Sequence, residues 1–224
     1  MRISNFDHYF ILSTRQFHQP INSHQSHFTP QLLSKTQQEK TLYLTFDDGP
    51  VPGVIEPLLD FLGEYQIKAT FFILGSCAER HPKLLTKIAK ADHSIANHSY
   101  SHAQFHKISH VEKITEIEKT NHVIKQITGE NCTLFRAPQG RWDFVLLFSM
   151  MRKKITAVHW SRDSQDFLKE PADKIAERFL QNPVKSGDII LFHDDDTRCI
   201  DALKILIPQW LEQGYSFNAL EHTD

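Results

Sequence analysis

The sequence has few cysteines, no long apolar run and no excess of positive charge, and each absence excludes a class of protein. Cys77, Cys132 and Cys199 are too widely spaced for a zinc ribbon and too few for a disulfide framework, so we expect free, buried thiols, as in a reducing compartment. No run of about eighteen apolar residues occurs, so no membrane span is expected. A formal net charge of −2 provides no basic field to attract nucleic acid.

The first forty residues also lack the features of an export signal. Arg2 could begin one, but the apolar stretch 9–12 is too short, and no small-residue cleavage site follows it. Residues 16–38 are rich in Gln, His, Ser and Pro, which predicts an extended or poorly ordered arm over residues 1–40. From these features we expect a cytoplasmic protein.

From residue 41 onward, β-prone and helical segments alternate. Apolar residues recur at helical spacing in segments 52–65, 82–90, 109–128, 142–152, 171–181 and 200–212. Short β-prone runs occupy segments 41–46, 69–74, 93–97, 133–135, 155–160, 188–192 and 216–220. This alternation predicts one α/β domain over residues 41–224, with a parallel sheet covered by helices. Seven or so strands in one domain favour a barrel, closed or incomplete, over an open sheet.

The clearest helix is segment 109–128. Ser109 and Glu112 form a capping-box pattern at its start, and Gly129 stops it.

Polar side chains follow five of these strands. The first strand ends in Asp47 and Asp48, and the turn at Gly49-Pro50 can bring both carboxylates into one pocket. The other strand ends carry His98 and His102, Arg136, Asp163, and His193. Because the active sites of parallel α/β barrels lie at the carboxyl ends of the strands, these groups predict a single catalytic site.

His98 and His102 are four residues apart, which brings both imidazoles to one face of a helix or turn. Alone, such a pair serves capping or surface roles more often than metal binding. With Asp48 it supplies three ligands, and zinc sites that leave the fourth position to water are catalytic.

Five segments in order resemble the motifs of the NodB-homology polysaccharide deacetylases, carbohydrate esterase family 4. They are TFDDGP (45–50), HSYSH (98–102), RAPQG (136–140), DSQDF (163–167) and LFH (191–193). The resemblance covers about residues 41–220 and implies a distorted (β/α) barrel with about seven parallel strands. It further implies a metal-dependent deacetylase that hydrolyses the N-acetyl amide of an amino sugar in a polysaccharide, oligosaccharide or glycoconjugate.

The resemblance also implies a role for each matching residue. Asp48, His98 and His102 would hold the metal, Zn²⁺ or another divalent transition metal such as Co²⁺. Asp47 would be the general base, and Arg136 would pair with it and keep it ionised.

On the leaving-group side, the resemblance makes His193 the general acid. Asp163 would orient His193 and support its charged form. Leu191 would line the pocket for the acetyl methyl group.

Two residues depart from the family pattern. Gln139 stands where the family usually has Tyr, although its backbone N–H could still reach the oxyanion. Phe167 replaces the usual Trp and keeps a smaller hydrophobic wall. Trp160 ends the fifth strand and could be a sugar platform, although core packing is the commoner role for such a residue.

Two alternatives to this function stay open, another substrate or no catalysis. The substrate could be an O-acetyl ester, a formamido sugar or a non-sugar amide, or the protein could bind carbohydrate without turnover.

The acidic run 194–196 is expected to be a solvated loop, or else to favour an ammonium product or raise the pKa of His193. The expected partner is an N-acetylated sugar, and no obligate protein partner is implied.

Overall fold

Eight parallel strands build the sheet in this computed structural model, which describes residues 40–221. The strands are β1 (Lys40–Asp47), β2 (Thr70–Ile73), β3 (Ser94–Asn97), β4 (Leu134–Phe135), β5 (Thr156–Ala157), β6 (Arg162–Asp163), β7 (Ile189–His193) and β8 (Tyr215–Phe217). The arm expected over residues 1–40 lies outside the described residues except for Lys40, which begins β1 one residue before the predicted domain boundary.

The helices that cover the sheet are α1 (Ile55–Glu64), α2 (Gly75–Arg80), α3 (Pro82–Lys90), α4 (His110–Thr128), α5 (Phe144–Arg152), α6 (Ala172–Gln181) and α7 (Arg198–Glu212). Two short 3₁₀ turns, η1 (Pro138–Gly140) and η2 (Asp166–Leu168), follow β4 and β6.

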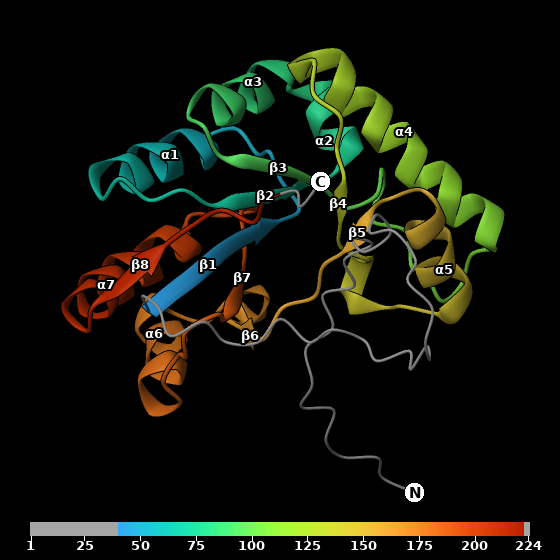
Figure 1. Ribbon diagram of the computed structural model, residues 1–224. Coiled ribbons are helices and arrows are strands. Elements are labelled where there is room, and N and C mark those ends of the chain that lie inside the picture. Colours follow the sequence, from blue (N-terminus) through green and yellow to red (C-terminus); the bar gives the residue numbers. More distant parts are fainter. Residues whose placement is uncertain (1–39, 222–224) are drawn as a thin grey trace, which may run out of the picture.

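Seven strands follow one path, in the order β5-β4-β3-β2-β1-β7-β6, and β8 pairs with the beginning of β1. The sheet curls, and the helices lie around its outside (Figure 1). The fold is therefore an incomplete barrel of parallel strands, which confirms the predicted distorted (β/α) barrel. Because every strand runs in the same direction, the carboxyl ends of β1, β3, β4, β6 and β7 meet along one edge.

Strand β1 is the centre of the hydrophobic core. Leu42, Leu44 and Phe46 are fully buried on one face, where the Phe46 ring stacks on that of Phe71 with centroids 5.0 Å apart. Residues 42–46 of β1 are apolar except for Thr45, which is typical of a strand covered on both faces.

Local sequence signals agree with several observed boundaries. Ser109 and Glu112 form the predicted capping box of α4, and Gly129 ends the helix in the left-handed conformation. The three cysteines are free and buried, as predicted. Within residues 40–221, no helix is both long and apolar enough to cross a membrane.

Candidate active site

The base expected from the sequence, Asp47, lies at the end of β1 in a buried pair with Arg136. Arg136 Nη1 donates to Asp47 Oδ1 at 2.7 Å and to Thr45 Oγ1 at 2.8 Å. The Thr45 hydroxyl donates in turn to the Ile190 carbonyl of β7 at 2.8 Å. Arg136 and Asp47 are both shielded from solvent, so the carboxylate has a fixed cationic partner.

Arg136 is held on its other side by aromatic rings. Its guanidinium carbon lies 3.9 Å from the centroid of Phe72 and 5.7 Å from that of Trp160. Burial lowers the pKa of Arg136, and the charge of Asp47 counteracts this. The ring contacts and the Asp47 pair together stabilise a cation that is fully removed from water.

Asp48, His98 and His102 form the one candidate metal cluster within residues 40–221, and their ligand atoms lie within 4.8 Å of one another. Asp48 Oδ1 is 3.6 Å from Nε2 of both histidines. Asp48 has a φ of 81°, a left-handed conformation that breaks the alternation of the strand. Asp47 and Asp48 can therefore both face the site, as the Gly49-Pro50 turn predicted.

The loop that carries the two histidines is fixed by hydrogen bonds within itself and to helix α4. Asn97 Oδ1 accepts from the Ser99 amide at 2.7 Å, and Ser99 Oγ accepts from the His102 amide at 3.1 Å. Glu116 of α4 accepts from the Tyr100 amide at 3.0 Å and the Ser101 amide at 2.7 Å. These contacts hold both imidazoles before any ligand binds.

The three residues fit a divalent metal on three counts. His98 Nδ1 lies 2.9 Å from the carbonyl oxygen of Arg136, so Nδ1 carries the proton and Nε2 keeps its lone pair for a metal. Burial lowers the pKa of His98, which favours the neutral form that binds metals. Asp48 Oδ1 is buried and has no hydrogen-bond partner within the described part of the chain, as expected of an atom that accepts a cation.

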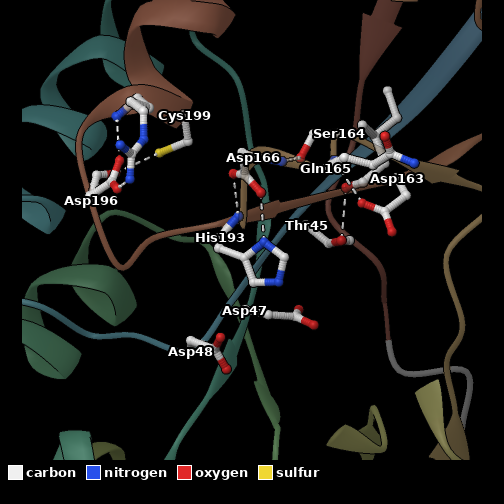
Figure 2. A network of polar contacts seen from close by, with 12 residues as sticks. Thr45, Asp47, Asp48, Asp163, Ser164, Gln165, Asp166, His193, Asp196 and Cys199 are labelled. Atoms are coloured by element: carbon white, nitrogen blue, oxygen red, sulfur yellow. Dashed lines mark hydrogen bonds and ion pairs between the residues drawn. The ribbon is translucent and has the colours of Figure 1, made fainter. Parts of the chain in front are cut away.

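The carboxylate that orients His193 is Asp166, so the prediction of Asp163 for this position was wrong. Asp166 Oδ1 lies 2.6 Å from His193 Nδ1, and Asp166 Oδ2 accepts from the His193 amide at 2.9 Å. Asp163 Oδ1 instead accepts from the Gln165 amide at 2.8 Å. Figure 2 shows Asp166 directed at the imidazole of His193, while Asp163 lies farther from that ring. Gln165, with a φ of 56°, turns the chain between them.

This contact determines the protonation of His193. Burial disfavours the imidazolium, but the hydrogen bond and charge of Asp166 outweigh it and raise the pKa of His193 to about 9. His193 is thus protonated at neutral pH, with Nδ1 bound to Asp166. It is also the register partner of Asp47 across β1 and β7, so the expected acid and base lie on adjacent strands.

The four residues expected to bind substrate lie around these groups. Phe167 is half-exposed and meets the His193 ring edge-on, with centroids 6.0 Å apart. Leu191 is buried in β7, and Gln139 is exposed within η1 in the left-handed conformation. Trp160 lies against the Gly140 turn, where a Cβ at residue 140 would approach its ring to 2.7 Å.

Asp194 is a buried residue, so the expected solvated loop over 194–196 was wrong at this position. It is 1% exposed, and its amide donates to the Asp47 carbonyl at 3.1 Å. A Cβ at Gly49 would come within 1.9 Å of Asp194 Oδ2, so residue 49 has to be glycine. Burial and the nearby Asp48 raise the pKa of Asp194 well above its ordinary value. Asp194 therefore supports the turn that carries Asp48.

Proteins with similar sequences include deacetylases of chitooligosaccharides and of peptidoglycan. A family model described as polysaccharide deacetylase matches residues 34–158. A chitooligosaccharide deacetylase from Sinorhizobium fredii is 31% identical over 80% of this chain and 90% of its own length. The peptidoglycan-N-acetylmuramic acid deacetylase PdaC from Bacillus subtilis is 34% identical over 79% of this chain, which spans only 37% of that longer protein.

Solved structures agree with the sequence matches. The peptidoglycan deacetylase PdaC from Bacillus subtilis superimposes with a TM-score of 0.76 at 32% identity, over 81% of this chain and 88% of that one. A family 4 carbohydrate esterase from Streptomyces lividans, in complex with acetate, gives a TM-score of 0.76 at 28% identity over 81% and 93% of the two chains. From its fold, its motifs and these matches, the chain belongs to the polysaccharide deacetylase family of NodB homology, carbohydrate esterase family 4.

Proposed function

We propose that this protein is a metal-dependent deacetylase that hydrolyses the N-acetyl amide of an amino sugar in a polysaccharide, oligosaccharide or glycoconjugate. One observation carries the proposal. One edge of the sheet, where the strands end, brings together a three-ligand cluster, a carboxylate paired with Arg136, and an imidazole paired with Asp166. Amide hydrolysis needs activation of water, stabilisation of an oxyanion and protonation of a poor leaving group, and these groups suit those needs.

Asp48, His98 and His102 would hold the metal, either Zn²⁺ or another divalent ion such as Co²⁺. When bound, such an ion lowers the pKa of a coordinated water and polarises the amide carbonyl. The chain prepares the site through the His98 contact to the Arg136 carbonyl, which fixes the tautomer that leaves Nε2 available.

Asp47 is the proposed general base. Its Oδ1 is occupied by Arg136, while Oδ2 lies 3.6 Å from His98 Nε2, within the cluster. Oδ2 is therefore the oxygen that takes a proton from the attacking water. Arg136 holds the Asp47 carboxylate in place through Oδ1, and a base in this position typically contributes about 10²–10⁴-fold in rate.

His193 is the proposed general acid. It carries a proton at neutral pH because its pKa is raised to about 9, and Asp166 fixes the ring through Nδ1. Nε2 is thus the nitrogen that donates to the leaving amine. Leu191 would contact the acetyl methyl group, the Gln139 amide would face the oxyanion, and Phe167 would pack against the sugar.

A second candidate uses the same chemistry on another acyl group, such as an O-acetyl ester, a formamido sugar or a non-sugar amide. The observation in its favour is the pair Gln139 and Phe167, which are both exposed at the rim of the site and both depart from the usual residues.

Acetate release from N-acetylglucosamine oligomers tests the proposal. Metal-stripped protein should release no acetate, and adding zinc or cobalt should restore release. Asp47→Asn should abolish the restored activity, whereas Asp195→Asn, a matched change of an exposed carboxylate, should preserve it. Metal binding at one ion per chain without acetate release from any oligomer would contradict the proposed substrate. Turnover of an ester or formamido sugar in its place would support the second candidate.

A further inference from the structure

Helix α5 turns an apolar face toward solvent. The exposed fractions of its outward side chains are 91% for Phe144, 57% for Val145, 59% for Phe148 and 43% for Met151. At 100° per residue these positions lie on one side of the helix. The outward side of a helix on a globular protein is normally polar, and a cluster of large exposed apolar side chains marks an interaction surface.

The outward apolar residues are not needed to attach α5 to the domain. Leu146 and Met150, on the opposite side, are buried in a cluster with Phe105 and Phe135. The helix also begins with a side-chain cap, in which Asp143 Oδ1 accepts from the Leu146 amide at 2.8 Å. The buried side and the capped start of α5 therefore attach the helix to the domain without any contribution from the outward side chains.

The ends of the same helix are basic. Segment 141–154 contains Arg141, Arg152, Lys153 and Lys154 against one acidic residue, Asp143, within a chain whose formal charge is −2. Lys113 pairs with Asp143 at 2.5 Å, which neutralises that carboxylate. Lys153 pairs with Glu118 of α4, so the cationic character of this face rests on the other basic side chains.

The size of the face bears on its partner. A nine-residue helix is about 14 Å long and about 10 Å wide. The area of such a face is well below the ~800 Å² that each partner contributes to a stable protein complex. A lipid bilayer needs no such area, because a short helix with aromatic residues on one face and cations at its edges binds within the headgroup region. Anionic lipids attract the cations, and the apolar side chains enter the acyl boundary.

We propose that the outward face of α5, formed by Phe144, Val145, Phe148 and Met151 with Arg152 at its edge, docks on an anionic phospholipid bilayer. The proposal does not depend on the deacetylase function. If both hold, the docked helix is close in sequence to the site, because only η1 and a short connection separate α5 from Arg136. The enzyme would then work beside a membrane surface, on a glycan attached to that membrane.

Vesicle flotation of the full chain tests the proposal. Wild-type protein should float with vesicles of phosphatidylcholine mixed with phosphatidylglycerol, and less with phosphatidylcholine alone or at high salt. Phe144→Ser with Phe148→Ser should weaken binding about tenfold or more, because both rings lose apolar burial in the bilayer. Arg152→Gln with Lys154→Gln should remove most of the preference for anionic vesicles. Leu180→Ser with Leu211→Ser, at exposed apolar positions on α6 and α7, should float like wild type.

Several results would overturn the proposal. They are failure of the wild type to float with either vesicle, or equal flotation of wild type and the double phenylalanine variant. Concentration-dependent self-association that the same variant abolishes, without vesicle binding, would show an interface between copies instead. Thermal melting and release of acetate from soluble oligomers would show whether each variant is folded, and the charge variants test the proposal independently of the phenylalanines.

Discussion

The two halves of the candidate site are built differently. The base half consists of Asp47 and Thr45 of β1 and of Arg136, which follows β4 and has no exposed surface. The acid half consists of His193 and Asp166, and Asp166 comes from a 3₁₀ turn after a two-residue edge strand. The base half is therefore rigid and costly to disturb, whereas the acid half depends on a short local turn.

The largest effect is expected from the base half. Asp47→Asn removes the proton acceptor but keeps the shape and the hydrogen-bond acceptor for Arg136. The reaction should slow by about 10²–10⁴-fold in kcat/KM, measured as acetate release with saturating metal. Metal affinity should change little, because Asp48, His98 and His102 are intact. A rate within a few-fold of wild type would give the role of base to another group.

Arg136→Met separates stability from chemistry in the same half. Asp47 would be left buried without its cation, which should reduce the free energy of unfolding by about 3–5 kcal/mol in urea denaturation. Adding Asp47→Asn to this variant should recover part of the loss, because the unpaired charge is then gone. A double variant no more stable than Arg136→Met would contradict the charge pair as the cause.

In the acid half, Asp166→Asn should act mainly on the pH profile. His193 has to be protonated to donate, so activity should fall as pH rises through its pKa of about 9. Without the charge of Asp166 that pKa drops toward its ordinary value, and the loss of activity should move to lower pH. Asp163→Asn, the matched control three residues earlier, should shift the profile less. Equal shifts in both variants would mean that the two carboxylates share the role.

The smallest effect is expected at the rim. Phe167→Ala removes the ring beside His193 but no proton carrier, so KM should rise by a few-fold to about tenfold with kcat nearly unchanged. Steady-state kinetics on oligomers of increasing length would measure this. A large loss of kcat would instead show that Phe167 positions His193.

The same contrast explains what the sequence could predict. Strands β1 and β7 are mostly apolar and buried, and the ends of such strands locate Asp47, Asp48 and His193. Arg136 follows the two-residue strand β4, so the RAPQG motif rather than a strand pattern located it. The fold class and the three-residue cluster followed from these signals, and the structure brings those side chains together.

The acid half lacks such signals. Strand β6 has only two residues, Arg162 and Asp163, which is too short for a periodic pattern. Which of Asp163 and Asp166 faces His193 depends on the left-handed conformation of Gln165, a residue with no special tendency to adopt it. The motif contained both carboxylates, but only the backbone turn distinguishes them. The burial of Asp194 was similarly hidden, because it depends on the space left by Gly49.

The positive φ of Asp48 has a mechanical consequence. It lets two adjacent residues face one site, so the proposed base and a proposed metal ligand share a single planar peptide unit, with α-carbons about 3.8 Å apart. Movement between strands cannot separate them. His193 is held beside Asp47 by non-covalent contacts between β1 and β7, which thermal motion can lengthen. As the protein warms toward unfolding, proton delivery to the departing amine should therefore fail before the activation of water does.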